Sequence, residues 1–292
     1  GQTNLVWQGS TGAIGHTLLA GLEVSRQDTT SLRADPVFAG SPNVALARRM
    51  TIPAVTFAAP SRSALSKVDT WSAYVQDQVE LASFLQVVAG VRYDEFRIAA
   101  TDRIKGTGAQ RTDRKWSPRF GLLLKPRPEM SFYASFTRSF LPQSGDQFSV
   151  LDATTASLAP EKFENLEAGV KWALTPTLFA TAAVFRLDRS NTRAVDPANP
   201  ALTVLTGKSR VEGFEASLVG RILPDLQASF GYTFLDGGLL TTSTAGPAGR
   251  RQAQQPRHQA SAWARNDQSD RFGLGLGAVY QGEQFASVSN AV

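Results

Sequence analysis

Apolar and polar side chains alternate in one segment after another of this chain, and the stretch from Trp71 to Phe96 shows the pattern clearly. In its first half, one face carries Trp71, Ala73, Val75 and Val79, and the other carries Ser72, Tyr74, Gln76, Gln78 and Glu80. After a four-residue turn at 80–83, Leu85, Val87, Ala89, Val91 and Tyr93 oppose Gln86, Arg92 and Asp94. Because successive side chains of a strand point to opposite faces, this stretch predicts a β-hairpin with one apolar and one polar face.

The same alternation recurs along the whole chain, and segments with a helical period are nearly absent. Most of the segments have the roughly 9–11 residues, or slightly more, that a tilted strand needs to cross a bilayer. The predicted strands lie near 3–9, 15–25, 69–79, 84–97, 112–124, 129–138, 161–173, 177–189, 209–221, 225–235, 257–266 and 271–281.

The predicted connections alternate between short and long. Short ones lie at 10–14, 81–83, 126–128, 174–176, 223–224 and 267–269, and long ones at 26–68, 98–111, 139–160, 190–208 and 236–256. Compact soluble domains keep most connections short. In an antiparallel meander, this alternation places every long loop at the same end, which is the layout of an outer-membrane barrel.

Aromatic residues support a membrane-spanning interpretation, because aromatic girdles mark both membrane interfaces of such barrels. Near the short turns we assign to the apolar face Phe132, Trp172, Phe179 and Phe272, and toward the long loops Trp71, Tyr93, Trp116, Phe185 and Tyr280. Asp77 interrupts the apolar face, but close to a short turn, where an acidic residue costs only about 0–1 kcal/mol. The glycines of "GLGLG" (273–277) are expected to allow close packing in the lumen.

Composition excludes several classes of protein. No run of the 292 residues approaches 18 consecutive apolar positions, so no transmembrane helix is predicted, and no signal peptide is visible in residues 1–20. The absence of cysteine excludes disulfides, thiol catalysis and cysteine-based zinc sites. The net charge of +5 comes from scattered basic residues with only short doublets, such as Arg48-Arg49 and Arg250-Arg251, so no nucleic-acid partner is predicted.

No catalytic motif is found, so no catalytic residue, metal site or enzyme activity is predicted, and an outer-membrane enzyme is kept only as a weak alternative. The two histidines, His16 and His258, are interpreted as strand-end residues. The adjacent carboxylates of Asp94 and Glu95 alternate across the two faces, so they cannot act together on one substrate. No phosphate-binding loop or dinucleotide fingerprint occurs.

Several stretches resemble one known family. "SAYVQDQVEL" with "LQVVAGVRYDEF", and "WSPRFGLLLKP" with "MSFYASFTRSFLPQSG", resemble two hairpins from the β-barrel of TonB-dependent siderophore receptors. "LAPEKFENLEAGVKW" is the most specific match, and "GKSRVEGFEASLVGRILPDLQASFGYTFLD" resembles a further strand pair of that family. The resemblance extends from about residue 3 to residue 285.

The resemblance implies an all-β fold: an antiparallel transmembrane β-barrel meander in the bacterial outer membrane, with about 12 strands of a barrel of about 22. Residues 1–292 would form part of a barrel domain without the family's plug and TonB-contact motif. The implied function is TonB-energised uptake of ferric siderophores by a monomer in contact with outer-membrane lipid. Iron would arrive as a chelate, and the protein would need no cofactor of its own.

Residues facing such a chelate are expected near the long-loop end. The candidates are Phe140, Gln143, Phe148, Trp116, Phe38 and Phe57. Polar-face residues Arg92, Arg119, Glu167, Lys171 and Glu215 are expected to line the lumen. A passive porin-like channel and a soluble β-sandwich binding module remain as alternatives. We also expect an open, curved sheet in which the strands near 3–9 and 271–281 do not pair.

Overall fold

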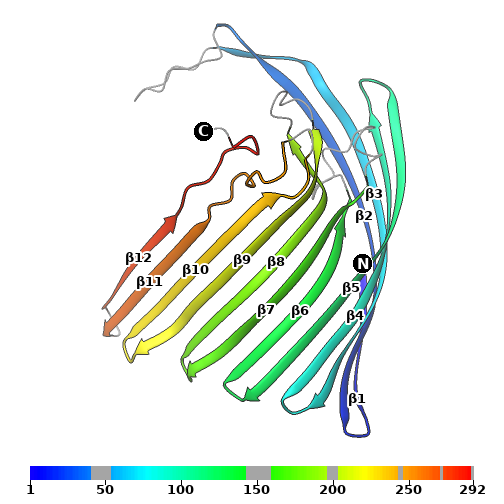
Figure 1. The fold of residues 1–292 in the computed structure, drawn as a ribbon. Helices are drawn as coiled ribbons and strands as arrows, with labels where there is room; N and C mark the ends of the chain where they lie inside the picture. The colour runs from blue at the N-terminus through cyan, green and yellow to red at the C-terminus, as the bar shows by residue number, and fades with distance from the viewer. Residues whose placement is uncertain (41–53, 143–158, 196–202, 243–245, 270–271, 291–292) are drawn as a thin grey trace.

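The computed structural model describes residues 1–40, 54–142, 159–195, 203–242, 246–269 and 272–290 (Figure 1). Every regular element in these ranges is a β-strand. The described residues therefore contain no helix that could cross a membrane. The strands are β1 (Gln2–Thr11), β2 (Ile14–Phe38), β3 (Val55–Ala82), β4 (Leu85–Asp102), β5 (Thr107–Arg127), β6 (Met130–Leu141), β7 (Glu161–Thr175), β8 (Leu178–Val195), β9 (Thr203–Leu223), β10 (Leu226–Leu239), β11 (His258–Ser269) and β12 (Phe272–Gln281).

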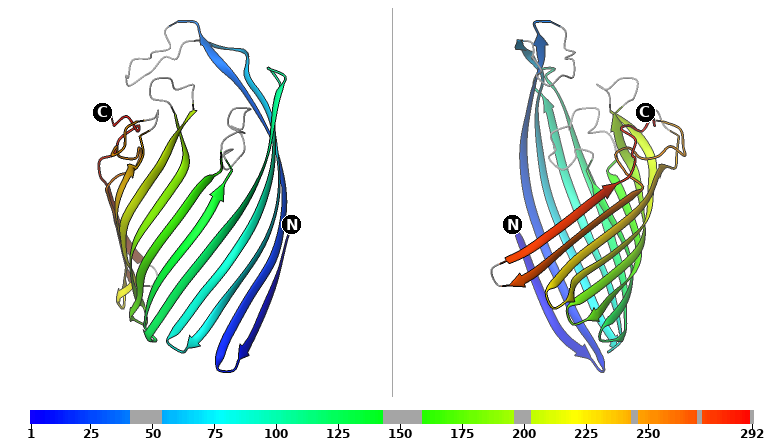
Figure 2. Two further views of the ribbon diagram at one scale, coloured as in Figure 1. Left: turned by 45° about the vertical axis from the view of Figure 1, so that its right-hand side comes forward. Right: turned by 90° about the vertical axis from the view of Figure 1, so that its left-hand side faces the viewer.

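The twelve strands form one antiparallel sheet in which each strand pairs with its neighbours in the sequence. The order runs from β1 to β12, and among the described residues these two outermost strands share no hydrogen-bonded pairs. The sheet bends into an open trough rather than a closed cylinder (Figure 2). The predicted meander, its strand number and its gap are therefore confirmed, and the β-sandwich alternative is not, because the described strands form a single layer.

The short connections lie where the sequence predicts them, within a few residues, and all at one end of the sheet (Figure 1). The turn between β3 and β4, for example, joins Ala82 to Leu85, and the turn between β9 and β10 joins Leu223 to Leu226. The strand ends from which the long connections leave share the opposite end. The side chains near that end are therefore the candidates for contact with an external ligand.

Three predicted long loops are wrong in extent, because paired strands occupy most of them. In the predicted loop 26–68, β2 and β3 pair as far as Phe38↔Val55 and form a ribbon that rises above the neighbouring strands (Figure 1). In the predicted loop 98–111, β4 and β5 pair as far as Asp102↔Thr107, and in 190–208 β8 extends to Val195 while β9 begins at Thr203. Strands need not stop at the membrane surface, so bilayer thickness underestimates their length.

Near the long-loop end, the ladder between β5 and β6 stops earlier than its neighbours. Its last pair is Arg119↔Thr137, whereas β5 keeps its pairing with β4 up to Thr107. β6 also continues to pair with β7, up to Leu141↔Glu161. Beyond this point β5 pairs only with β4, and β6 pairs only with β7, among the described residues.

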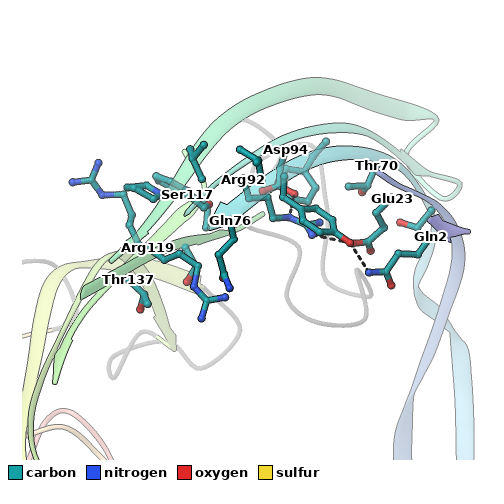
Figure 3. A pocket seen from close by; sticks show the side chains of 18 of the residues that line it. Gln2, Glu23, Thr70, Gln76, Arg92, Asp94, Ser117, Arg119 and Thr137 are labelled. Carbon is teal, nitrogen blue, oxygen red and sulfur yellow. Dashed lines mark hydrogen bonds and ion pairs between the residues drawn. The ribbon is translucent and has the colours of Figure 1, made fainter. Parts of the chain in front are cut away.

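The register places the predicted lumen residues on a single face. Arg92 lies beside Ser117, two residues from Arg119, and the same face continues through Glu167, opposite Ser135, to Glu215, opposite Ala183. Polar side chains thus line the concave side of the trough, where Gln76, Arg92 and Arg119 appear in Figure 3.

The other face is apolar and largely uncovered. Large hydrophobic side chains such as Leu22, Leu122 and Leu276 are exposed along it. Toward the long-loop end, three aromatic rings of neighbouring strands contact one another in tilted orientations: centroids lie 5.2 Å apart for Trp71 and Tyr93 and 4.9 Å for Tyr93 and Trp116. A single-layered sheet with such an exposed face is stable against lipid rather than against water.

Two aromatic assignments are wrong. Phe179 and Phe185 lie on the polar, lumen-side face, because Phe185 is opposite Glu167 on β7 and Gly213 on β9. The ring of Phe185 lies over Gly213, within 2.5 Å of where a β-carbon would be. Both faces of β8 carry apolar residues, so its alternation alone does not decide which side meets lipid, and the neighbouring strands decide it.

The glycines of 273–277 pack as the sequence predicts. The indole of Trp263 on β11 crosses β12 so closely that a β-carbon at Gly277 would lie 2.3 Å from it, and one at Gly275 would lie 2.7 Å from it. Asp267 and Gly273 belong to the same polar face. These glycines therefore make room for a large ring on the lumen side.

Candidate functional site

A concavity with a volume of about 840 Å³ lies on the polar face of β1–β6 (Figure 3). Its wall consists mainly of polar-face residues of these strands. Its side toward β6 lies where the β5–β6 ladder ends, and there it includes the consecutive residues 137–140 from both faces of the strand. Residues that line it include Gln2, Glu23, Arg92, Asp94, Arg119 and Phe140.

Arg92 is the centre of the wall. Its guanidinium lies 3.0 Å from the Glu23 carboxylate and 2.7 Å from that of Asp94, and it donates a 2.8 Å hydrogen bond to the Ser72 hydroxyl. Ser72 in turn donates to Asp94 over 2.6 Å. Three strands thus hold one cation between two carboxylates, which fixes the position of its side chain.

Next to Arg92, the wall continues toward β1 with the ring of Tyr74 and the side-chain amides of Gln2 and Asn4. The Arg92 guanidinium lies 5.5 Å from the centroid of the Tyr74 ring, a cation–π contact. Gln2 donates a 2.7 Å hydrogen bond to the Tyr74 hydroxyl, which in turn donates to Asn4. Polar groups of four neighbouring strands are therefore connected, so this part of the concavity is rigid before any ligand arrives.

The opposite side of the concavity is less restrained. No ion pair is seen for Arg119 among the described residues, and its guanidinium faces the concavity beside Thr137 (Figure 3). Above it, the Lys115 ammonium lies 5.4 Å from the centroid of the Phe140 ring. A cation and an aromatic ring next to an interrupted ladder form a surface suited to a polar ligand with aromatic groups.

The six residues expected to face a chelate lie in different places. Phe140 lines the concavity, whereas the Trp116 ring lies on the apolar face beside Tyr93. Phe38 and Phe57 lie on the ribbon of β2 and β3, where Phe57 is strongly exposed. Gln143 and Phe148 fall outside the described residues. Ligand contact by these residues stays a prediction, with Phe140 in the most suitable position.

The sequence did not single out Glu23, Ser72 or Tyr74 as partners of Arg92. Each is polar and lies on the polar face of its own strand, so alternation places them on the correct side. Their proximity depends on the register between β2, β3 and β4, which the alternation of one strand does not specify.

The two histidines lie at strand ends, as predicted: His16 near the start of β2 and His258 at the start of β11. The His16 imidazole lies 2.7 Å from the Asp77 carboxylate, so the acidic residue that interrupts the apolar face has a partner. The His258 imidazole lies 2.9 Å from the Tyr232 hydroxyl. No cluster of three or more histidine or acidic residues suited to a metal occurs in the part of the chain that the structure describes.

A carboxylate closes the turn between β4 and β5 at the long-loop end. Asp102 accepts hydrogen bonds from the backbone N–H groups of Lys105, at 3.0 Å, and Ile104, at 2.9 Å. The bond from Lys105, followed by that from Ile104 and the nearby charge of Lys105, lowers the pKa of the Asp102 carboxyl below its usual value, against the opposing effect of burial. The tip of this hairpin is thus an ordered part of the rim.

Comparison with known proteins places this geometry in a family. The family model described as "TonB dependent receptor-like, beta-barrel" matches residues 1–292. The chain is 30% identical over 269 residues to the metal-pseudopaline receptor CntO of Pseudomonas aeruginosa, which covers 89% of this chain and 37% of the relative. It is 26% identical to the catecholate siderophore receptor Fiu of Escherichia coli, covering 100% of this chain and 42% of Fiu.

Solved structures agree with this fold. The siderophore receptor PiuA from Acinetobacter baumannii superposes with a TM-score of 0.83 at 24% identity, covering 99% of this chain and 46% of that chain. The chain thus spans less than half the length of the relatives it matches. Residues 1–292 belong to the TonB-dependent receptor-like β-barrel family, whose members are outer-membrane proteins of Gram-negative bacteria.

Proposed function

We propose that the protein containing this segment takes up ferric siderophores across the outer membrane, energised by the TonB complex. The observation that carries the proposal is the concavity on the polar face, with its fixed Arg92 wall and its freer Arg119 and Phe140 side. Relatives named as receptors for metal-pseudopaline and for catecholate siderophores support this class of ligand.

In this proposal, the long-loop end faces the medium and receives the chelate, with Phe140, Phe38 and Phe57 as candidate contacts. Catecholate chelates carry negative charge and aromatic rings, which a guanidinium and a phenyl ring bind through ion pairing and stacking. Iron enters as part of the ligand. The receptor acts as a monomer, and it contacts TonB through a region outside residues 1–292.

The test is uptake of radioactive iron as ferric chelates by cells that express the whole receptor with Arg119→Gln or Phe140→Ala. Loss of one charged or stacking contact should weaken chelate binding by about 1–3 kcal/mol, or roughly five- to 150-fold. Ser131→Ala, on the polar face near the short turns and far from the concavity, is the control and should keep uptake unchanged.

The energy dependence of uptake distinguishes this proposal from the passive porin-like alternative. A TonB-energised receptor stops uptake when the proton gradient is collapsed, whereas passive diffusion continues. Uptake that persists without the gradient, or without TonB, would reject the proposal. Unchanged chelate affinity in both variants would instead reject only the assignment of the concavity as the binding site.

A further inference from the structure

The ladder between β5 and β6 ends next to a proline. Its last pair toward the long-loop end is Arg119↔Thr137, although both strands continue beyond it. The register would next place Pro118 opposite Arg138. This pair does not form among the described residues, so the cause of the interruption is expected at one of its two members.

The backbone direction of β5 shows why Pro118 matters at this position. The amide of Lys125 donates over 2.7 Å to the carbonyl of Phe84, just before β4, so Lys125 directs its backbone groups toward β4. This direction alternates along a strand, and β4 and β5 pair without a register shift, so even-numbered residues of β5 point toward β6. At Pro118 the N–H that would bond to β6 is missing, because proline has none.

The interruption changes the surroundings of Phe140. If the ladder continued, Phe140 would lie opposite Trp116, on the apolar face where the Trp116 ring contacts Tyr93. Instead, Phe140 borders the concavity, and its ring centroid lies 5.4 Å from the ammonium of Lys115, which the register places on the polar face beside Asp94. The Phe140 ring therefore lies where a ligand in the concavity can contact it.

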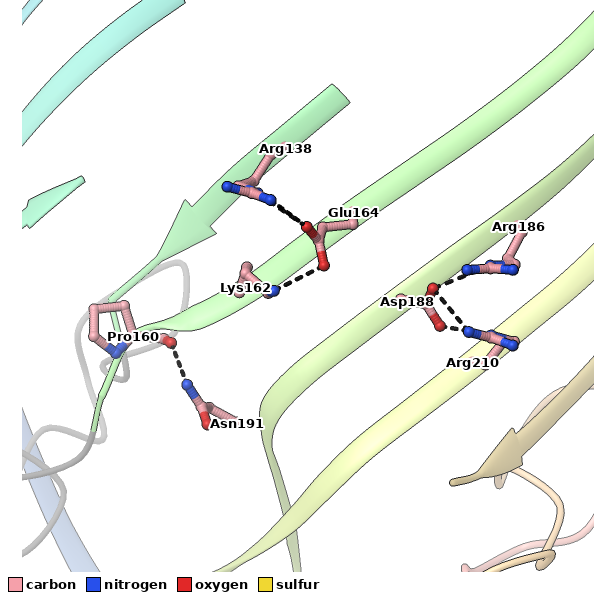
Figure 4. Close-up of polar contacts among 8 residues, drawn as sticks. All are labelled: Arg138, Pro160, Lys162, Glu164, Arg186, Asp188, Asn191 and Arg210. Carbon is pink, nitrogen blue, oxygen red and sulfur yellow. Dashed lines mark hydrogen bonds and ion pairs between the residues drawn. The ribbon is translucent and has the colours of Figure 1, made fainter. Parts of the chain in front are cut away.

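The two strands are held on either side of the interruption by their other neighbours. β6 continues to pair with β7 up to Leu141↔Glu161, and the guanidinium of Arg138 lies 2.7 Å from the carboxylate of Glu164 on β7 (Figure 4). β5 keeps its pairing with β4 as far as Thr107. A missing bond between β5 and β6 can therefore separate their ends without unfolding either strand.

We propose that Pro118 is a positioning residue for the concavity: by ending the β5–β6 ladder, it places the Phe140 ring where a bound ferric chelate contacts it. The role of Phe140 rests on the proposed function, whereas the effect of Pro118 on the ladder does not. A residue with a backbone N–H at position 118 lets the ladder extend and turns Phe140 toward Trp116 on the apolar face.

The first measurement is amide hydrogen exchange of the whole receptor without ligand, read by mass spectrometry of peptides that contain Trp116 and Phe140. The bond from the Ala173 amide to the Glu129 carbonyl directs odd-numbered residues of β6 toward β7, so the Phe140 amide points toward β5. Pro118→Ala and Pro118→Val should both slow exchange at Trp116 and Phe140 roughly tenfold, because each amide gains a partner.

Pro126→Ala is the matched control, since Pro126 also lies on β5 but near the short turns. It should leave both hydrogen exchange at Trp116 and Phe140 and the affinity for a chelate unchanged. Parent-like exchange in Pro118→Ala and Pro118→Val would overturn the proposal, because the ladder would then end for a reason other than the missing N–H.

The second measurement is a double-mutant cycle on the affinity of the whole receptor for the ferric complex of dihydroxybenzoate, an anionic aromatic chelate. Pro118→Ala and Phe140→Ala should each weaken binding roughly five- to 150-fold, as expected for the loss of one stacking contact. The double variant should bind within about threefold of Phe140→Ala, because both changes remove the same contact.

Losses that multiply in the double variant would overturn the positioning role, since Pro118 would then affect binding independently of Phe140. So would parent-like affinity in Pro118→Ala when Phe140→Ala binds weakly. If the parent receptor binds no ferric chelate, the proposed function fails, and hydrogen exchange still decides whether Pro118 ends the ladder.

Discussion

At the scale of single residues, position along a strand decides which medium a side chain meets. Ala168 on β7 lies on the apolar face between Ala134 of β6 and Val184 of β8. It is four residues from Trp172, near the short turns, and four from Glu164, which pairs with Arg138 and Lys162 toward the other end (Figure 4). Ala168 is thus close to the middle of the bilayer.

Ala168→Arg should therefore destabilise the folded barrel by about 2–4 kcal/mol, the cost of an arginine on the lipid face at the midplane. The measurement is equilibrium unfolding of the whole receptor in lipid bilayers. Ala183→Arg, a neighbour on the lumen side opposite Glu215, is the matched control and should cost much less. Equal costs for the two variants would contradict the assignment of faces. Ala89 is a poorer probe, because an arginine there would meet Asp77 directly across the ladder.

Phe185 shows where residue-level prediction reaches its limit. Along β8, Phe179, Thr181 and Ala183 alternate with Leu178, Ala180 and Ala182, so neither face is clearly polar. The side that Phe185 occupies is set by pairing with Glu167 and Gly213 on other strands. On strands with strong contrast, such as β4, the face could be predicted from the sequence alone.

At the scale of elements, the turn between β4 and β5 depends on one carboxylate. The hydrogen bonds from Lys105 and Ile104 to Asp102 lower the pKa of that carboxyl in the folded state. A lowered pKa means that this contribution to stability is fully present above the unfolded value of about 3.9 and is lost as the pH falls through the folded value. The tip should therefore loosen only in acid.

Amide hydrogen exchange at Ile104 and Lys105 measures this effect. Asp102→Ala should remove their protection at neutral pH, whereas Asp102→Asn, which keeps an acceptor oxygen, should retain much of it. In the parent, protection relative to the alanine variant should begin to decline below about pH 4 and disappear once the pH falls through the lowered pKa of Asp102. A pH-independent difference between parent and alanine variant would show that the charge of Asp102 has no part in holding the turn.

The existence and order of the strands could be predicted, but the length of the longest ones could not. Within the bilayer, one face meets lipid and the other the lumen, so alternation is strong. Beyond it, both faces of β2 and β3 meet water, and residues such as Thr29, Thr30 and Ser31 show no contrast. The pairing of β2 with β3 in this part can therefore be recognised only in the structure. The contacts of Arg92 could not be predicted from the sequence either, because its partners lie on three different strands.

At the scale of the whole molecule, the described strands form one sheet with an apolar outer face and two free edges, β1 and β12. β1 pairs only with β2, and β12 only with β11. The outer side of each edge strand therefore presents N–H and C=O groups without partners among the described strands. In hydrocarbon, each such group costs several kcal/mol, so lipid does not accept an open sheet edge.

Residues 1–292 expressed alone should consequently aggregate through these edges or fail to insert, and should not transport iron. The measurement is refolding into lipid vesicles, followed by sedimentation and by the gel mobility shift that folded barrels show before heating. The whole receptor, refolded in parallel, is the control and should insert as a discrete species, because further strands can pair with both edges. A monodisperse, vesicle-inserted form of the segment would mean that its edges find partners in some other way, as would iron uptake by cells expressing the segment alone.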